Sequence, residues 1–308
     1  MERYNGTAWT KTHIDGALLL DVAATPSGTV VAATVHSIFV SNDNGDSYTT
    51  VTGVGGASQS ASVWGADKEY LALVGTWDDP NSKRKYAIEG VAYSTDKGQT
   101  WSLSAPVPPG APRYGAFPSD KVWYVSSGLW GASAKSERSE GKFSFSQRFD
   151  FNRGLLKSTT TDYTGWWGAV SKTTDGGKTW EQIFQTDYEK DTFYFNAISC
   201  SSETHCAVIA EGYDENGVQQ AKIHVTWDGG VTWTPTLVTD DYSMVSVKFI
   251  NDNDGWALGT DVIDRQDLYG QFYRTSDGGK TWELFQVSNI SHHANLFILS
   301  IFFSYSSP

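Results

Sequence analysis

The sequence TSDGGKTW at residues 275–282 is one of five near-copies spread along the chain. The other four are SNDNGDSY (41–48), STDKGQTW (94–101), TTDGGKTW (173–180) and TWDGGVTW (226–233). All five read Ser/Thr-x-Asp-x-Gly-x-Ser/Thr-aromatic, and successive aspartates are 53, 79, 53 and 49 residues apart. A repeat of about 50 residues is typical of an array of similar structural units.

Each copy stands inside a longer unit with the pattern of four β-strands. In the last unit, VSVKFINDNDGWALGT (245–260) predicts two strands joined by a polar turn, and FYRT (272–275) predicts a third. The motif then forms a turn, and a fourth strand continues from its aromatic residue. Antiparallel units of this size make the blades of a β-propeller. We therefore predict an all-β chain with five complete four-stranded blades and a partial closing blade, in a six-bladed or truncated seven-bladed propeller.

The residue types of the motif suit a structural turn. The aspartate can accept hydrogen bonds from turn N–H groups, the glycine supplies a positive φ, and the aromatic ring buries a large area between neighbouring sheets. No aspartate differs from its copies, as a catalyst would, so we predict that all five motifs are structural. The residues concerned are Asp43, Gly45 and Tyr48; Asp96, Gly98 and Trp101; Asp175, Gly177 and Trp180; Asp228, Gly230 and Trp233; and Asp277, Gly279 and Trp282.

These motifs resemble the Asp-box, or bacterial neuraminidase, repeat family over about residues 5–286. The resemblance implies a β-propeller fold. It is much less specific for activity, because such propellers include sialidases, xyloglucan-cleaving glycosidases, sortilin-type receptors and photosystem II assembly factors. The segment 247–285 looks most like the assembly-factor type. Because that likeness concerns the repeat, it implies fold rather than partner.

The repeat spacing predicts where the blades begin and end within a single domain, 1–308. The predicted blades are 13–54, 55–106, 107–186, 187–238 and 239–287. Asn5-Gly6-Thr7-Ala8-Trp9 matches the tail of the motif, so the chain is predicted to begin on a fourth strand. The closing blade would combine 288–308 with 1–12, and its shortage of material leaves open a genuine closing strand or a truncated end.

The overall composition excludes some classes of function. The formal net charge of −12 argues against a nucleic-acid-binding surface. With no run of 18 apolar residues, the sequence predicts no membrane span. Cys200 and Cys206 have only His205 near them, too few ligands for zinc, so we predict a disulfide rather than a metal site, and no cofactor. A disulfide favours an extracellular or secretory location, and two free thiols are the alternative.

Ligand sites are expected in the loops between the second and third strands of each blade. The longest of these, 129–168, explains the 79-residue spacing and combines aromatic residues with an excess of cations. Such a loop suits an anionic, protein or glycan partner, whereas the alternative is a hairpin that packs its rings on its own blade. The candidate binding residues are Arg113, Tyr114, Trp130, Arg148, Arg153, Trp166 and Trp167.

The sequence favours a non-enzymatic scaffold, with a glycoside hydrolase as the alternative. No catalytic residue is assigned, because three convergent arginines cannot be identified and loop aspartates such as Asp78, Asp79, Asp261 and Asp264 are usually turn formers. The adjacent pair Tyr188-Glu189 proves no geometry. The expected partner of this monomeric scaffold is a protein first and a glycan second.

Overall fold

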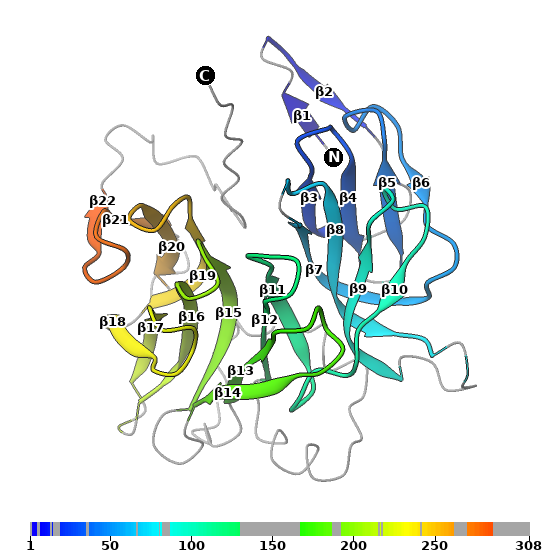
Figure 1. Ribbon diagram of the computed structural model, residues 1–308. Coiled ribbons are helices and arrows are strands. Elements are labelled where there is room, and N and C mark those ends of the chain that lie inside the picture. The colour runs from blue at the N-terminus through cyan, green and yellow to red at the C-terminus, as the bar shows by residue number, and fades with distance from the viewer. Residues whose placement is uncertain are drawn as a thin grey trace. The chain divides into compact units, whose positions relative to one another are not determined.

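The computed structural model describes residues 2–4, 7–12, 14, 19–34, 37–65, 67–79, 81, 87–129, 167–186, 192–214, 216, 218–240, 242–261 and 270–285. These residues form 22 β-strands and no helix. The chain divides into two compact units, Met1–Val125 with Ser171–Glu181 and Ser126–Val170 with Gln182–Pro308 (Figure 1).

Five sheets of four antiparallel strands account for most of the described residues, and in each sheet the strands follow chain order. The predicted all-β class with four-stranded antiparallel repeats is confirmed. The strands of the first two sheets are β3 (Leu19–Ala24), β4 (Val30–Thr34), β5 (Ile38–Ser41) and β6 (Thr49–Thr50), then β7 (Gly56–Trp64), β8 (Tyr70–Trp77), β9 (Ile88–Ser94) and β10 (Ser102–Leu103).

The remaining three sheets repeat this plan, and the division between the two units falls within the first of them. Their strands are β11 (Pro112–Ala116), β12 (Trp123–Leu129), β13 (Trp167–Thr173) and β14 (Glu181–Gln185), then β15 (Thr192–Cys200), β16 (Cys206–Tyr213), β17 (Gln219–Thr226) and β18 (Thr234–Asp240), then β19 (Tyr242–Phe249), β20 (Gly255–Asp261), β21 (Gly270–Thr275) and β22 (Glu283–Phe285).

The N-terminal segment differs from the expected single fourth strand. It forms a two-stranded antiparallel sheet of β1 (Glu2–Tyr4) and β2 (Trp9–Lys11). The physical reason is that Glu2 to Tyr4 find pairing partners in Trp9 to Lys11, so a strand also precedes the residues that resemble the motif tail. The proposed closing segment 288–308 lies outside the described residues.

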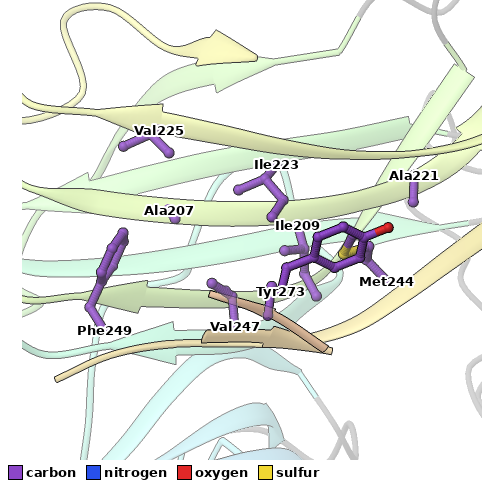
Figure 2. Close-up of a cluster of buried hydrophobic side chains, with 10 residues drawn as sticks. Ala207, Ile209, Ala221, Ile223, Val225, Met244, Val247, Phe249 and Tyr273 are labelled. Atoms are coloured by element: carbon purple, nitrogen blue, oxygen red, sulfur yellow. The ribbon is translucent and has the colours of Figure 1, made fainter. Parts of the chain in front are cut away.

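A buried apolar layer joins the last two sheets within the second unit. Ile209 and Ile223 face Met244, Val247 and their neighbours across this layer, as Figure 2 shows. Ile223 and Met244 are fully buried, and each such side chain stabilises the fold by about 1.5–3 kcal/mol relative to an exposed one. This packing is what the alternating apolar residues of β17 and the continuous apolar run of β16 predict.

The first strand of four sheets carries an irregularity at the same place. The register against the second strand shifts between Leu19 and Asp21, and the shift recurs in β7, β15 and β19. In the second unit, the bulge turns Asn196 so that its Nδ2 donates to the carbonyl of Met244 in the next sheet at 2.9 Å. A β-bulge thus re-aims a polar side chain to tie one sheet to the next.

Candidate functional site

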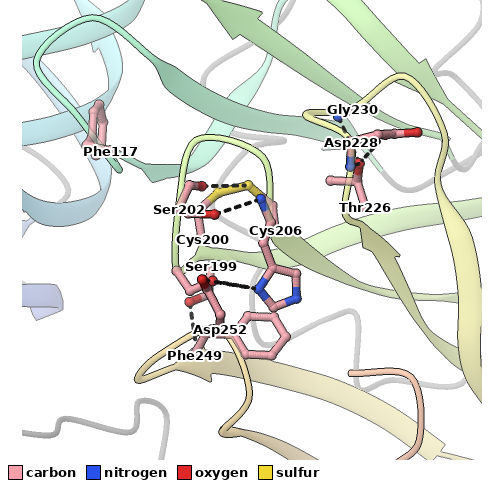
Figure 3. The surroundings of a disulfide bond; sticks show 12 residues. Phe117, Ser199, Cys200, Ser202, Cys206, Thr226, Asp228, Gly230, Phe249 and Asp252 are labelled. Carbon is pink, nitrogen blue, oxygen red and sulfur yellow. Dashed lines mark hydrogen bonds and ion pairs between the residues drawn. A yellow bond between two sulfur atoms is a disulfide. The ribbon is translucent and has the colours of Figure 1, made fainter. Parts of the chain in front are cut away.

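The fourth motif shows how each repeat holds its turn (Figure 3). The Thr226 hydroxyl donates to Asp228 Oδ1 at 2.8 Å, and it accepts from the N–H of Gly230 at 2.8 Å. On the other side of the turn, Thr232 donates its N–H to Asp228 Oδ1 at 2.9 Å and its hydroxyl to Oδ2 at 2.6 Å. Both oxygens of the carboxylate are therefore bound by the turn itself.

The same set of hydrogen bonds recurs in all five motifs. The first and seventh positions supply hydroxyls in every copy, and the glycine N–H always donates to the first hydroxyl. The pairs of hydroxyl residues in the other four copies are Ser41 and Ser47, Ser94 and Thr100, Thr173 and Thr179, and Thr275 and Thr281.

These hydrogen bonds lower the pKa of the aspartates. The pKa of Asp96, Asp175 and Asp228 falls from 3.8 to about 2, first because of the threonine hydroxyl at the seventh position. The pKa of Asp43 is lowered still further, chiefly by the hydroxyls of Ser41 and Ser47. A general acid at neutral pH needs a raised pKa, so these carboxyls are perturbed in the direction opposite to that of an acid catalyst.

The pKa of Asp277 is also lowered, but there burial opposes the hydrogen bonds more strongly than in the other motifs. Partial burial is the largest effect there and raises its pKa, but the hydrogen bonds from Thr281 and Thr275 together outweigh it, so the pKa again lies at about 2. Because the folded pKa lies below the unfolded value, the stabilisation is complete above about pH 4 and is lost as the pH falls toward 2.

The glycine and aromatic positions of the motif connect one sheet to the preceding one. Gly230 has φ +91°, and a Cβ added there would lie 2.2 Å from Ile183 Cδ1 of the preceding sheet. Trp233 stacks on Phe184 of that sheet with ring centroids 5.4 Å apart. The motif aromatics are half-buried.

We expect Thr226→Val to lower the free energy of unfolding by about 1–3 kcal/mol, because it leaves Asp228 Oδ1 and the Gly230 N–H without a shared buried hydroxyl. Valine keeps the shape of threonine, so packing changes little. Urea denaturation would measure the loss, and Thr234→Val serves as a comparison at an exposed threonine that begins the neighbouring strand β18. An unchanged midpoint for Thr226→Val would show that the motif does not stabilise its turn.

Three of the predicted binding residues fall within the described part of the chain. Arg113 and Tyr114 lie on β11, where the Arg113 guanidinium is 5.6 Å from the centroid of the Tyr114 ring and the Arg113 residue is only 7% exposed. Trp167 begins β13 and is fully buried, so its ring packs inside the protein rather than on an open loop. The other candidates, Trp130, Arg148, Arg153 and Trp166, lie outside the described residues.

A buried polar group that sequence reasoning missed lies at one end of β15, β16 and β17. Tyr194 and Glu211 are opposite each other in the ladder, and the Tyr194 hydroxyl donates to Glu211 Oε1. The two residues are 5% and 8% exposed. On β17, the Lys222 amine lies 4.1 Å from the centroid of the Phe193 ring. The available signal was Glu211 inside the otherwise largely apolar strand β16. The Tyr188-Glu189 pair lies outside the described residues.

The predicted disulfide is present between Cys200 and Cys206, which are paired across β15 and β16 (Figure 3). The turn that it closes carries His205, whose buried ring lies 4.4 Å from the Phe249 ring. His205 Nε2 lies 2.8 Å from the carbonyl oxygen of Gly278 in the next motif, and Nδ1 lies 2.5 Å from Ser201 Oγ. Since a carbonyl only accepts, Nε2 carries the proton and donates to it. The disulfide turn therefore fastens one sheet to the next.

In the part of the chain that the structure describes, no group of three or more His, Cys, Asp or Glu side chains is arranged to hold a metal ion. The same residues include no helix of the length and hydropathy needed to span a membrane.

Comparison with protein families identifies the repeat. The BNR/Asp-box repeat model matches residues 92–103, which include the second motif. A search of the curated proteins finds no match.

Solved structures share the fold at low sequence identity. The nidogen/laminin complex is 9% identical with a TM-score of 0.50, over 90% of this chain and 82% of that one. YCF48 bound to D1 peptide is 14% identical with a TM-score of 0.39, over 87% and 80%. Trypanosoma rangeli sialidase in complex with sialic acid is 13% identical with a TM-score of 0.45, over 85% of this chain and 42% of that one. At these identities the likeness concerns the fold alone.

Proposed function

We propose that this chain, in which the BNR/Asp-box repeat model matches residues 92–103, is a non-enzymatic scaffold that binds a partner protein. The observation that supports this proposal most strongly is the state of the five motif carboxylates. Each is bound through both oxygens by its own turn, and the pKa of each is lowered. These groups hold turns together and are not poised to transfer protons.

A protein partner is proposed ahead of a glycan. Apolar side chains are exposed on the second unit, and Val231 and Val238 are 83% and 49% exposed. Exposed aliphatic side chains suit a protein interface, whereas sugars are bound mainly by aromatic faces and polar groups. The solved likenesses include proteins of both kinds, a nidogen/laminin complex and a sialidase.

Location and oligomeric state complete the proposal. The Cys200–Cys206 disulfide supports an oxidising compartment, outside the cell or in a secretory lumen. The net charge of −12 opposes self-association, which supports a monomer.

The test begins with chemical cross-linking of the purified protein in an extract of its natural source, followed by identification of the bound proteins. A purified candidate is then titrated by calorimetry against the wild-type protein. We expect saturable binding of one partner. The folded Tyr194→Phe variant should bind the same partner with the same affinity, because a scaffold does not need the Tyr194 hydroxyl for chemistry. Failure to reconstitute binding with any purified candidate would contradict the scaffold proposal.

A glycoside hydrolase is the second candidate, and the Tyr194–Glu211 pair is the observation that favours it. A phenol hydrogen-bonded to a carboxylate is a plausible nucleophile pair. The burial of both residues opposes this assignment, since a sugar would have to reach them. Release of fluorophore from a panel of fluorogenic glycosides, lost in Glu211→Gln, would support the enzyme; we expect no release above the rate of heat-unfolded protein.

A further inference from the structure

The outermost strand of the fourth sheet differs from its counterparts. It is β18 and has seven residues, whereas the outermost strands of the other four sheets have two, two, five and three. In each sheet the outermost strand is paired on one side only among the described strands. Long unpaired edges are unusual, because they expose backbone N–H and C=O groups that can pair with another chain.

Between Pro235 and Asp240, the sequence of β18 lacks the usual protection of an edge strand. It reads TPTLVTD, with no charge before Asp240 and with four β-branched residues. The longer of its counterparts carry a glutamate, Glu181 in β14 and Glu283 in β22. Pro235 has no N–H and lies at the start of the strand, which leaves residues 236–240 free to pair.

Exposed apolar side chains gather in the same sheet. Val231 lies in the turn that leads into β18, and Val238 lies on the strand itself. Trp227, in the same turn, is partly exposed and donates its indole N–H to the Gly278 carbonyl at 3.0 Å. The equivalent positions in the first motif are polar, Asn42 and Asp46, so this turn departs from the repeat.

Some backbone N–H and C=O groups of β18 point away from β17 and can pair with an added strand. Its ladder with β17 runs from Gln220 opposite Asp240 to Val225 opposite Thr234, with one register shift after Ile223. In an antiparallel pair, every second residue turns its N–H and C=O away from its neighbour. An added strand could therefore pair with about half of residues 236–240.

The negative charge of the chain favours a cationic peptide over a second copy of the chain as the binding partner of β18. The chain has a net charge of −12, and Asp240 at the end of the strand begins an Asp-Asp pair in the sequence. Lys222, on the neighbouring strand β17, is only 9% exposed and so is covered. A second copy of the chain would bring like charges together, whereas a cationic peptide is attracted.

We propose that the outer edge of β18 binds an extended, positively charged segment of a partner protein by strand addition. This inference rests on the proposed scaffold function and specifies one surface and the chemistry of its partner. The segment alternates apolar side chains, which cover Val238, with lysine or arginine near Asp240.

The probe is a fluorescein-labelled peptide, Lys-Val-Thr-Val-Lys-Val-Thr-Val-Lys, titrated against the wild-type protein and followed by anisotropy. We expect saturable binding below about 1 mM and at least about tenfold weaker binding of the same peptide with glutamate in place of lysine. Two further peptides carry N-methyl groups on either the valines or the intervening residues. Strand pairing predicts that one of them loses binding and the other keeps it.

Variants test the location on the chain. Val238→Lys should weaken binding of the lysine peptide at least about tenfold, because it places a like charge on the edge. The matched control is Thr50→Lys on the two-residue strand β6, which should leave binding unchanged. Bound peptide should also slow amide hydrogen exchange in residues 236–240 and leave β6 unaffected. The N-methyl peptides need no variant, so the test stands even if Val238→Lys fails to fold.

The inference would be overturned if the lysine peptide showed no saturable binding below about 1 mM, or if both N-methyl peptides bound equally well. It would also be overturned if sedimentation showed a dimer that Val238→Lys dissociates, because a second copy of the chain would then occupy the edge. A natural partner that still binds Val238→Lys would refute this surface and leave the scaffold function intact. Glycoside cleavage alongside peptide binding would refute the scaffold function and leave this surface intact.

Discussion

Gly278→Ala is expected to lower the free energy of unfolding by about 3 kcal/mol, through backbone strain and a steric clash together. Gly278 has φ +74°, which costs a residue with a Cβ about 1–2 kcal/mol. The added Cβ would also lie 2.7 Å from the backbone carbonyl oxygen of Asp252, an atom that cannot turn aside as a side chain can. The Gly278 carbonyl accepts hydrogen bonds from both His205 and Trp227. Strain at Gly278 should therefore weaken the contact between the fourth and fifth sheets.

Gly176 is the matched control for that substitution. It holds the same motif position with the same φ of +74°, but its added Cβ would lie 3.4 Å from the nearest atom, the carbonyl oxygen of Asp120. Gly176→Ala should therefore cost only the conformational part, about 1–2 kcal/mol. Urea denaturation of both variants measures the difference, and equal losses would show that the close approach to Asp252 is not a determinant of stability.

Loss of the disulfide is expected to lower the free energy of unfolding by about 2 kcal/mol. Cys200 and Cys206 are six residues apart, so the bond closes a short loop and restricts the unfolded chain only modestly. The folded state loses in addition the constraint on the turn that positions His205 against Gly278. Denaturation of the wild type with and without dithiothreitol measures the effect, and amide exchange should accelerate in residues 201–205.

The double variant Cys200→Ala/Cys206→Ala is the control for this experiment. It should match the reduced wild type in stability and should not respond to dithiothreitol. A wild type whose midpoint is unchanged by reductant would contradict a stabilising role for the bond.

The motif turns could be predicted from the sequence because their interactions are local. Within each eight-residue copy, every hydrogen bond of Asp228 and its counterparts joins residues at most four positions apart. Five copies of the same pattern also made the four-stranded sheets predictable, since strand, turn and motif recur in a fixed order. The disulfide followed from cysteines on either side of a short turn.

Contacts between distant residues could not be predicted in this way. Tyr194 and Glu211 are 17 positions apart, and His205 and Gly278 are 73 apart. Their meeting depends on strand register and on how sheets pack, which a single sequence does not reveal. Trp167 was expected to be available to a partner because it follows a long loop, but its place at the start of β13 puts it in the interior. The length of β18 was equally hidden, because nothing in TPTLVTD marks where an outer strand ends.

A pH titration of the side-chain carboxyls by carbon-detected NMR tests whether the five motif aspartates hold turns or transfer protons. Each signal is assigned by aspartate-to-asparagine substitution. We expect a pKa of about 2 for Asp96, Asp175, Asp228 and Asp277, and a lower value for Asp43. A motif aspartate with a pKa above its ordinary value of 3.8 would show that its carboxyl is not held by the turn and is free to act as an acid.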